Sequence, residues 1–335
     1  MNILMVSPTV FPDLTGNAVS AHRIAEGLRK LGHEVHVITP SDDVGPLQPH
    51  VVHALHAFKS ARAAILAKKF NVPLVVTMTG TDGNRDINDP QKRLVIAEVL
   101  FQAAAVVFYS DILKAKVVAE FPKIAEKALT IPKGMPILPD SEFQLRKALK
   151  LDENAILFTL VGSIRPVKNT LFAIAPLEKL HQQNPQVHLI VVGTILEDPE
   201  YGKKIMESLS GKSWAKYLEN ATREQIRQVY IESDVIVNCS LSESESNAII
   251  EAMILGKTLL ASDIDPNAAL IGSAGVTYRA GDADDFFRKA KALAEGKKDA
   301  FGDLAKQAIL RKLNPLEAED YVRVYEHAAS EHLGR

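Results

Sequence analysis

Short apolar runs rich in β-branched residues alternate along the chain with longer segments in which apolar residues recur every three to four positions. The first pattern is typical of buried strands and the second of amphipathic helices. In the amino-terminal part it predicts a helix at residues 18–31 and strands at residues 3–7, 34–39, 50–55, 74–78, 105–109 and 129–132. Strands that are apolar on both faces belong to parallel sheets covered by helices, so this part is expected to be doubly wound.

A proline-rich segment, residues 132–140, separates this series from a second one. The second series predicts strands at residues 155–161, 187–193, 234–239 and 258–262 and helices at residues 284–295 and 315–332. We therefore expect an α/β protein with two Rossmann-like domains, residues 1–140 and 141–313, that face each other across a cleft. Residues 314–335 are expected to form a terminal helix that braces both domains.

Composition and charge narrow the class of protein. The chain has 335 residues, of which 47% are hydrophobic and 24% charged, as in an ordinary soluble enzyme. Its single cysteine, Cys239, cannot form an internal disulfide or a cysteine-based metal cluster, which favours a cytoplasmic protein. The formal net charge of −2 does not indicate a protein that binds nucleic acid, and no apolar run is long enough for stable membrane insertion. These properties do not indicate an oligomeric state.

Open parallel sheets bind ligands at the carboxyl ends of their strands, so the loops there are the places to look for chemistry. The segment 162–169 follows a predicted strand and opens a helix, and it carries Arg165 and Lys168. A helix amino terminus with two nearby cations favours an anion such as a phosphate. A solvated pair of cations at a surface turn is the simpler interpretation of these two residues alone.

A second candidate loop, residues 239–247, is rich in serine and carries Glu243 and Glu245, with Glu251 eight residues after Glu243 in an apolar helix. A carboxylate in such surroundings is costly unless hydroxyl or N–H donors satisfy it, and sugar and ribose hydroxyls are such donors. Solvent exposure is the simpler interpretation of Glu245. Glu251 is expected either to face a cleft or to be buried without a protein partner.

Together these segments resemble the retaining glycosyltransferases of the GT-B fold, family four. The family's motif of two glutamates separated by seven residues is present as Glu243 and Glu251, followed by Ala252, Met253 and Gly256. Other short motifs stand in the family's order: Thr15-Gly16-Asn17, Gly32-His33-Glu34-Val35, Val52-His53-Ala54, Thr79-Gly80-Thr81-Asp82, Ile131-Pro132-Lys133-Gly134 and Ala261-Ser262-Asp263. Within the family, the chain resembles the glycosyltransferase one domain-containing group and, next to it, the selenosugar synthases.

The resemblance implies a role for each matching residue. Arg165 and Lys168 would hold the donor diphosphate, Glu243 the sugar hydroxyls and Glu251 the ribose hydroxyls, with Arg165, Lys168 and Glu243 as the catalytic set. Further donor-binding residues would be Gly16, Asn17, Gly162, Ser163, Ser244, Glu245, Ser246 and Asn247. The acceptor side would comprise His56, Thr79, Gly80, Thr81 and Asp82.

The mechanism that the resemblance implies is front-face displacement, in which the leaving phosphate takes the proton of the acceptor. It requires no cofactor and no metal, and the pair Asp263 and Asp265 is interpreted as loop structure. The expected substrates are a nucleotide sugar, with uridine as the base, and an unidentified small-molecule or glycan acceptor. The transferred group would be a hexosyl or N-acetylhexosaminyl group.

The chain departs from the family pattern at Thr79, where many members have histidine, and at Ser163, Ser244 and Glu245. Two alternatives therefore stay open. One is a selenosugar or thiosugar synthase that uses the same donor. The other is a nucleotide-sugar-binding protein with little catalysis.

Overall fold

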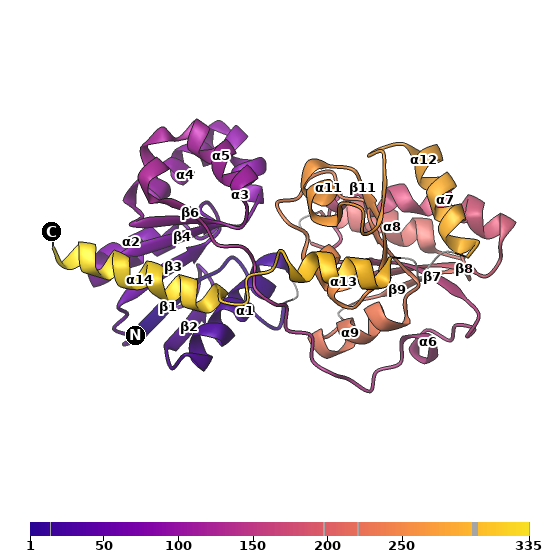
Figure 1. The fold of residues 1–335 in the computed structure, drawn as a ribbon, viewed down its shortest axis with the longest axis horizontal. Helices are drawn as coiled ribbons and strands as arrows, with labels where there is room; N and C mark the ends of the chain where they lie inside the picture. The colour runs from indigo at the N-terminus through magenta and orange to yellow at the C-terminus, as the bar shows by residue number, and fades with distance from the viewer. Residues whose placement is uncertain (14, 197, 220, 297–300, 335) are drawn as a thin grey trace. The chain divides into compact units, whose positions relative to one another are not determined.

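The computed structural model describes residues 1–13, 15–196, 198–219, 221–296 and 301–334. Within these residues the chain forms two compact units (Figure 1). The first comprises Met1–Met135 and Leu313–Arg335, and the second comprises Pro136–Lys312. Each contains a six-stranded, all-parallel sheet, which confirms the two doubly wound α/β halves. The cleft between the halves stays a prediction.

The sheet of the first unit has the strand order β2-β1-β3-β4-β5-β6. All six of its strands were expected, and they are β1 (Asn2–Val6), β2 (Glu34–Ile38), β3 (Val51–Leu55), β4 (Leu74–Met78), β5 (Ala105–Phe108) and β6 (Ala128–Thr130). Its helices are α1 (Gly16–Lys30), α2 (Arg62–Phe70), α3 (Thr81–Asn84), α4 (Pro90–Gln102), α5 (Asp111–Glu120) and α14 (Glu317–Leu333), with 3-10 turns η1 (Asp86–Asn88) and η2 (Pro122–Lys127).

Helices cover both faces of this sheet. Helices α1 and α14 pack on one face, and α2, α4 and α5 pack on the other. Buried polar contacts fix α14 in place: Arg23 donates to both carboxylate oxygens of Glu317 at 2.7 and 2.8 Å, and the hydroxyl of Tyr325 lies 2.8 Å from Nδ1 of His53. Burial lowers the pKa of His53 to about 3, so this imidazole is neutral near pH 7. The terminal helix thus belongs to the first unit, and its bracing of both domains stays a prediction.

The sheet of the second unit has the order β12-β11-β10-β7-β8-β9. Its strands are β7 (Ile156–Val161), β8 (Val187–Val192), β9 (Ala215–Leu218), β10 (Val235–Asn238), β11 (Thr258–Ser262) and β12 (Val276–Tyr278). Its helices are α6 (Leu145–Ala148), α7 (Thr170–Gln183), α8 (Pro199–Leu209), α9 (Arg223–Glu232), α10 (Asn247–Ile254), α11 (Asp265–Ile271), α12 (Ala283–Ala294) and α13 (Gly302–Leu310), with the 3-10 turn η3 (Pro166–Lys168). The sequence did not predict β9 and β12, which are short, partly exposed edge strands.

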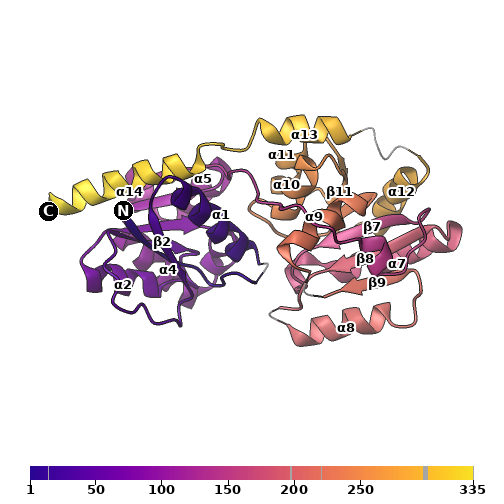
Figure 2. The same cartoon turned by 90° about the horizontal axis from the view of Figure 1, so that it is seen from below.

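Two groups of helices cover this sheet. Helices α7, α8 and α12 share a hydrophobic core with one face, where Phe172 stacks on Tyr278 and Phe286 meets both rings edge-on. Helices α10, α11 and α13 contact one another and contribute to the opposite side (Figure 2). Local capping fixes where several helices begin: Thr222 and Gln225 form a reciprocal capping box at the start of α9.

The strand order of the second sheet reverses between β7 and β10, which are neighbours. Such a switch point opens a crevice at the carboxyl ends of the two strands, because their connections leave to opposite sides. The loops after β7 and β10 contain the two candidate segments with Lys168 and Glu243. The topology therefore brings the predicted donor loops together.

Candidate active site

Backbone shape sets the course of the loop after β7. Gly162 has φ +142°, and Gly193, at the end of the neighbouring β8, has φ +144°, a region that favours glycine. A Cβ on Gly193 would lie 2.0 Å from the carbonyl oxygen of Gly162, so only glycine allows this close approach. Ile164 N then donates to the oxygen of Thr194 at 2.8 Å. The segment continues through the turn η3, at whose end Lys168 lies before α7 begins.

The loop after β10 is tied to the loop after β7. Leu241 N donates to the oxygen of Val167 at 2.9 Å, and the ammonium of Lys168 forms an ion pair with the carboxylate of Glu243. Ser240 Oγ donates to the same carboxylate at 2.8 Å. Glu243 is thereby held by a cation and a hydroxyl from two different loops.

Glu243 remains ionised although it is largely buried. Its side chain is 11% exposed, and burial alone would raise its pKa. The charge and hydrogen bond of Lys168, the hydroxyl of Ser240 and the charge of Arg165 outweigh burial and hold the pKa of Glu243 below its ordinary value. The site therefore presents a fixed carboxylate that can accept hydrogen bonds from hydroxyl groups near neutral pH.

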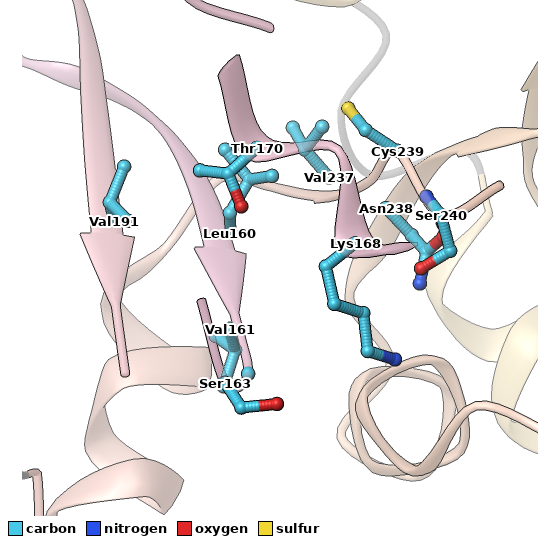
Figure 3. Close-up of a pocket in the computed structure, with 11 residues that line it drawn as sticks. Leu160, Val161, Ser163, Lys168, Thr170, Val191, Val237, Asn238, Cys239 and Ser240 are labelled. Carbon is cyan, nitrogen blue, oxygen red and sulfur yellow. Dashed lines mark hydrogen bonds between the residues drawn. The ribbon is translucent and has the colours of Figure 1, made fainter. Parts of the chain in front are cut away.

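A pocket lies at the carboxyl ends of β7 and β10 (Figure 3). Figure 3 shows the side chain of Lys168 coming from the turn after β7 and Asn238 and Ser240 on the neighbouring segment. The pocket is lined by Leu160, Val161, Gly162, Ser163, Lys168, Thr170, Val191, Val237, Asn238, Cys239 and Ser240. Three of the predicted site residues, Gly162, Ser163 and Lys168, thus line one pocket.

Helix α10 begins at Asn247, directly after the loop that follows β10. Ser246 is its N-cap residue, but the Ser246 hydroxyl accepts from Asn238 Nδ2 at 3.3 Å and does not cap the helix. The first turn carries no acidic side chain. The positive end of the helix dipole is therefore not neutralised by its own cap or first turn, and an anion can be stabilised there. Ser244, Glu245 and Asn247 are partly buried in and beside this loop.

The surroundings of Glu251 contradict the expectation that this residue either faces a cleft or is buried without a protein partner. It is 4% exposed, and its Oε1 lies 2.7 Å from a guanidinium nitrogen of Arg223, while Tyr230 donates to Oε2 at 2.9 Å. Arg223 Nε in turn donates to the oxygen of Ile137 at 2.7 Å. Apolar neighbours in α10 suggested isolation, but the partners come from α9, which the local sequence does not reveal. Glu251 is therefore part of a buried ion pair.

The sequence analysis assigned no role to three buried polar residues that contact one another beside the loop after β10. Asn238 ends β10, Ser262 ends β11 and Asn267 lies in α11, and all three are less than a tenth exposed. Asn267 Nδ2 donates to Asn238 Oδ1 and to the Ser262 oxygen, each at 3.1 Å. The sequence signal that could have pointed to them is the amide of Asn238 and the hydroxyl of Ser262, each at the carboxyl end of an apolar strand.

The predicted acceptor-side residues are brought together within the first unit. Asp82 Oδ2 accepts from Ala57 N at 2.9 Å, its Oδ1 accepts from Gly80 N at 2.8 Å, and His56 Nε2 lies 3.1 Å from the Thr81 hydroxyl. His56 and Asp82 are 0% exposed, and burial, countered in part by Asp82, lowers the pKa of His56. These two side chains shape the loops after β3 and β4.

Two other predicted acceptor-side residues have side chains that are more accessible than those of His56 and Asp82. Thr79 and Thr81 are only partly buried, in contrast to His56 and Asp82. Gly16 and Asn17 begin α1 of the same unit, where Thr15 accepts from Ala18 N. The roles of all these residues toward donor or acceptor stay predictions.

The two aspartates that resemble a metal motif have separate places. Asp263 Oδ1 accepts from Ala280 N at 2.8 Å, and Asp265 begins α11. The described residues contain no group of three or more histidine, cysteine, aspartate or glutamate side chains arranged to hold a metal ion. In the part of the chain that the structure covers, no helix combines the length and the apolar character that crossing a membrane requires.

Comparisons with known proteins agree with this architecture. A family model described as glycosyl transferases group 1 matches residues 141–309, half of the chain. Glycosyltransferase 1 domain-containing protein 1 of Xenopus tropicalis is 27% identical over 272 residues, which are 77% of each chain. D-inositol 3-phosphate glycosyltransferase of Kribbella flavida is 23% identical over 279 residues, 76% of this chain and 66% of that protein.

Solved structures show the same fold at low sequence identity. HepE of Anabaena, in complex with UDP and glucose, superposes with a TM-score of 0.79 at 18% identity and covers 97% of this chain and 99% of its own. Sucrose-phosphate synthase of Thermosynechococcus elongatus gives 0.77 at 16% identity and covers 99% and 100%. The chain therefore has the GT-B fold and belongs to the glycosyl transferases group 1 family, the family-four glycosyltransferases that its motifs resemble.

Proposed function

We propose that the chain is a retaining glycosyltransferase that moves a hexosyl or N-acetylhexosaminyl group from a UDP-sugar to a small-molecule or glycan acceptor. The observation that carries the proposal is the pair of Lys168 and Glu243, with the hydroxyl of Ser240, at the switch point between β7 and β10. Membership in the family supports it. Support for the donor comes from HepE, whose structures are described in complex with UDP and with UDP-glucose.

In this proposal the donor diphosphate binds between the loop after β7 and the amino terminus of α10. Lys168 and Arg165 supply positive charge, and the first-turn N–H groups of α10 supply oriented dipoles. Gly162, whose φ is positive, lets the backbone come close to the phosphates. Around them lie the remaining proposed donor-binding residues of the second unit: Ser163, Ser244, Glu245, Ser246 and Asn247.

The sugar and ribose of the donor meet the two glutamates. Glu243 accepts hydrogen bonds from sugar hydroxyls, because its carboxylate is ionised and fixed. Glu251 accepts from the ribose hydroxyls through lone pairs that Arg223 and Tyr230 leave available, since a carboxylate has about four acceptor sites. In the first unit, the loops with His56 and with Thr79, Gly80, Thr81 and Asp82 are proposed to contact the acceptor.

The reaction proceeds on one face of the sugar. The acceptor oxygen forms a bond to the anomeric carbon as the bond to the β-phosphate oxygen breaks, and the leaving phosphate takes the acceptor proton. Negative charge accumulates on the β-phosphate in the transition state, where preorganised cations and helix N–H groups stabilise it most. These groups can carry that charge without a metal ion, so we propose a metal-independent reaction.

A donor-cleavage assay tests the proposal. The chain is incubated with UDP-glucose or UDP-N-acetylglucosamine in excess chelator, and released UDP is measured by chromatography, with candidate acceptors added in parallel. We expect UDP release above that of the Glu243→Gln variant, and a sugar product with retained anomeric configuration. Release that occurs only after magnesium or manganese is added contradicts the metal-independent mechanism.

The same assay separates the two alternatives. Transfer to selenophosphate or a thiol-containing acceptor in preference to alcohols would identify a selenosugar or thiosugar synthase. Tight UDP binding without any donor cleavage, across all acceptors, would identify a nucleotide-sugar-binding protein. Either result would overturn the proposed reaction while leaving the donor site in place.

A further inference from the structure

The hydroxyl of Ser240 donates to Glu243, and the backbone of Ser240 is itself held on both sides. Ser240 N donates to Asn238 Oδ1 at 3.1 Å, and the Ser240 oxygen accepts from the hydroxyl of Ser262 at 2.7 Å. Asn267 contacts both of the residues that hold this backbone, with Nδ2 3.1 Å from Asn238 Oδ1 and 3.1 Å from Ser262 Oγ. One amide group therefore connects the two supports of Ser240.

The orientation of both amides follows from their partners. A backbone N–H can only donate, so the end of Asn238 that faces Ser240 N is its oxygen, and its NH2 group faces Ser246 Oγ. A backbone carbonyl can only accept, so the end of Asn267 that faces the Ser262 oxygen is its NH2 group. The Ser246 hydroxyl therefore accepts from Asn238 and makes no capping hydrogen bond to α10.

The amide of Asn267 makes its hydrogen bonds through only one of its two ends. Asn267 is 0% exposed, and its Oδ1 is buried without a hydrogen-bond partner among the described residues. A buried acceptor without a partner destabilises a fold, so a residue that tolerates this loss is expected to act through its other contacts. Those contacts lead through Asn238 and Ser262 to Ser240, and from there to Glu243.

We propose that Asn267 is a positioning residue of the donor site: it holds Asn238 and Ser262 so that Ser240 donates to Glu243 and the Ser246 hydroxyl stays bound to Asn238. The inference rests on the proposed function for its effect on the donor. Its geometric part concerns Glu243 alone and can be measured without any ligand.

The first test measures the pKa of Glu243. Carbon-13 NMR follows the glutamate carboxyls with pH, and the Glu243→Gln variant identifies the signal. Because Ser240 helps to hold this pKa low, Asn267→Ala is expected to raise it, and so is Ser240→Ala. Asn267→Ala should add nothing in the Ser240→Ala background, because both changes remove the same hydrogen bond.

A matched control separates positioning from loss of stability. Leu270 lies in the same helix, is 5% exposed and has no place in the amide network, so Leu270→Ala removes core packing only. It should leave the pKa of Glu243 unchanged. If Asn267→Ala does not fold, Asn267→Ser replaces it, with a smaller shift expected. An unchanged pKa in the Asn267 variant, an equal shift in Leu270→Ala, or full additivity with Ser240→Ala overturns the inference.

The second test uses UDP as the probe in calorimetric titrations. Asn267→Ala is expected to weaken UDP binding about tenfold, the change that corresponds to about 1.4 kcal/mol, and Leu270→Ala to leave it unchanged. Wild-type affinity in Asn267→Ala overturns the effect on the donor site. A wild-type chain that does not bind UDP contradicts the proposed function instead, and the pKa measurement then decides the inference by itself.

Discussion

Replacing Lys168 with alanine is expected to lower kcat by 100-fold to 1,000-fold, roughly the loss caused by removing one preorganised group that stabilises developing charge. Lys168 is 23% exposed and lies against Glu243, so its ammonium is fixed before the donor arrives. If it acts on the charge that develops on the leaving phosphate, kcat falls more than donor affinity. Steady-state kinetics measures the loss of kcat in this variant, and UDP calorimetry measures the loss of affinity.

The variant also changes the pH dependence. Lys168 is the strongest group that holds the pKa of Glu243 below its ordinary value, so its loss lets burial raise that pKa. The acid side of the kcat/KM profile is then expected to move to higher pH. Lys203→Ala, an exposed lysine in α8, is the matched control and should leave the rates unchanged. Wild-type kcat in Lys168→Ala would remove Lys168 from the catalytic set.

Replacing Glu251 with glutamine is expected to lower the free energy of unfolding by about 3 kcal/mol, because it leaves the guanidinium of Arg223 buried without its charge partner. The side chains of Arg223 and Glu251 are 8% and 5% exposed. The corresponding fall in Tm is roughly 6–12 °C for a unit of this size. Differential scanning calorimetry of the protein without ligand measures it.

A double variant distinguishes the ion pair from other effects of the mutation. Arg223→Met combined with Glu251→Met should be more stable than the sum of the two single changes predicts, since no buried charge then lacks a partner. Glu200→Gln, at an exposed position of α8, should change Tm little. An unchanged Tm in Glu251→Gln would show that the pair with Arg223 contributes nothing to stability.

The sequence was sufficient for most of the fold. Strands buried on both faces leave continuous apolar runs, and ten of the strands in the described part were expected from them. Edge strands bury less and alternate less, so β9 and β12 carry little signal: Lys216 and Tyr217 in β9 are partly exposed. The apolar runs do not reveal the order of the strands within each sheet, because that order depends on which strands pair with one another.

The candidate site was predictable where its residues lie within one loop. Lys168 and Glu243 were each recognised from their own motif, and the switch point between β7 and β10 explains why they meet. Glu251 shows the limit, because its partner Arg223 is 28 positions away along the chain, from 223 to 251, in another helix. The contacts of Asn267 could not be predicted, because they depend on the pairing of β10 with β11.

A crystal structure of the chain with UDP would show directly whether the donor binds at the loops after β7 and β10. We expect density for the diphosphate beside Lys168 and the amino terminus of α10, with Glu243 next to the position of the sugar. Glu251 would lie beside the ribose with its contact to Arg223 retained. UDP bound only against the sheet of the first unit, or away from the loops after β7 and β10, would contradict the proposed donor site.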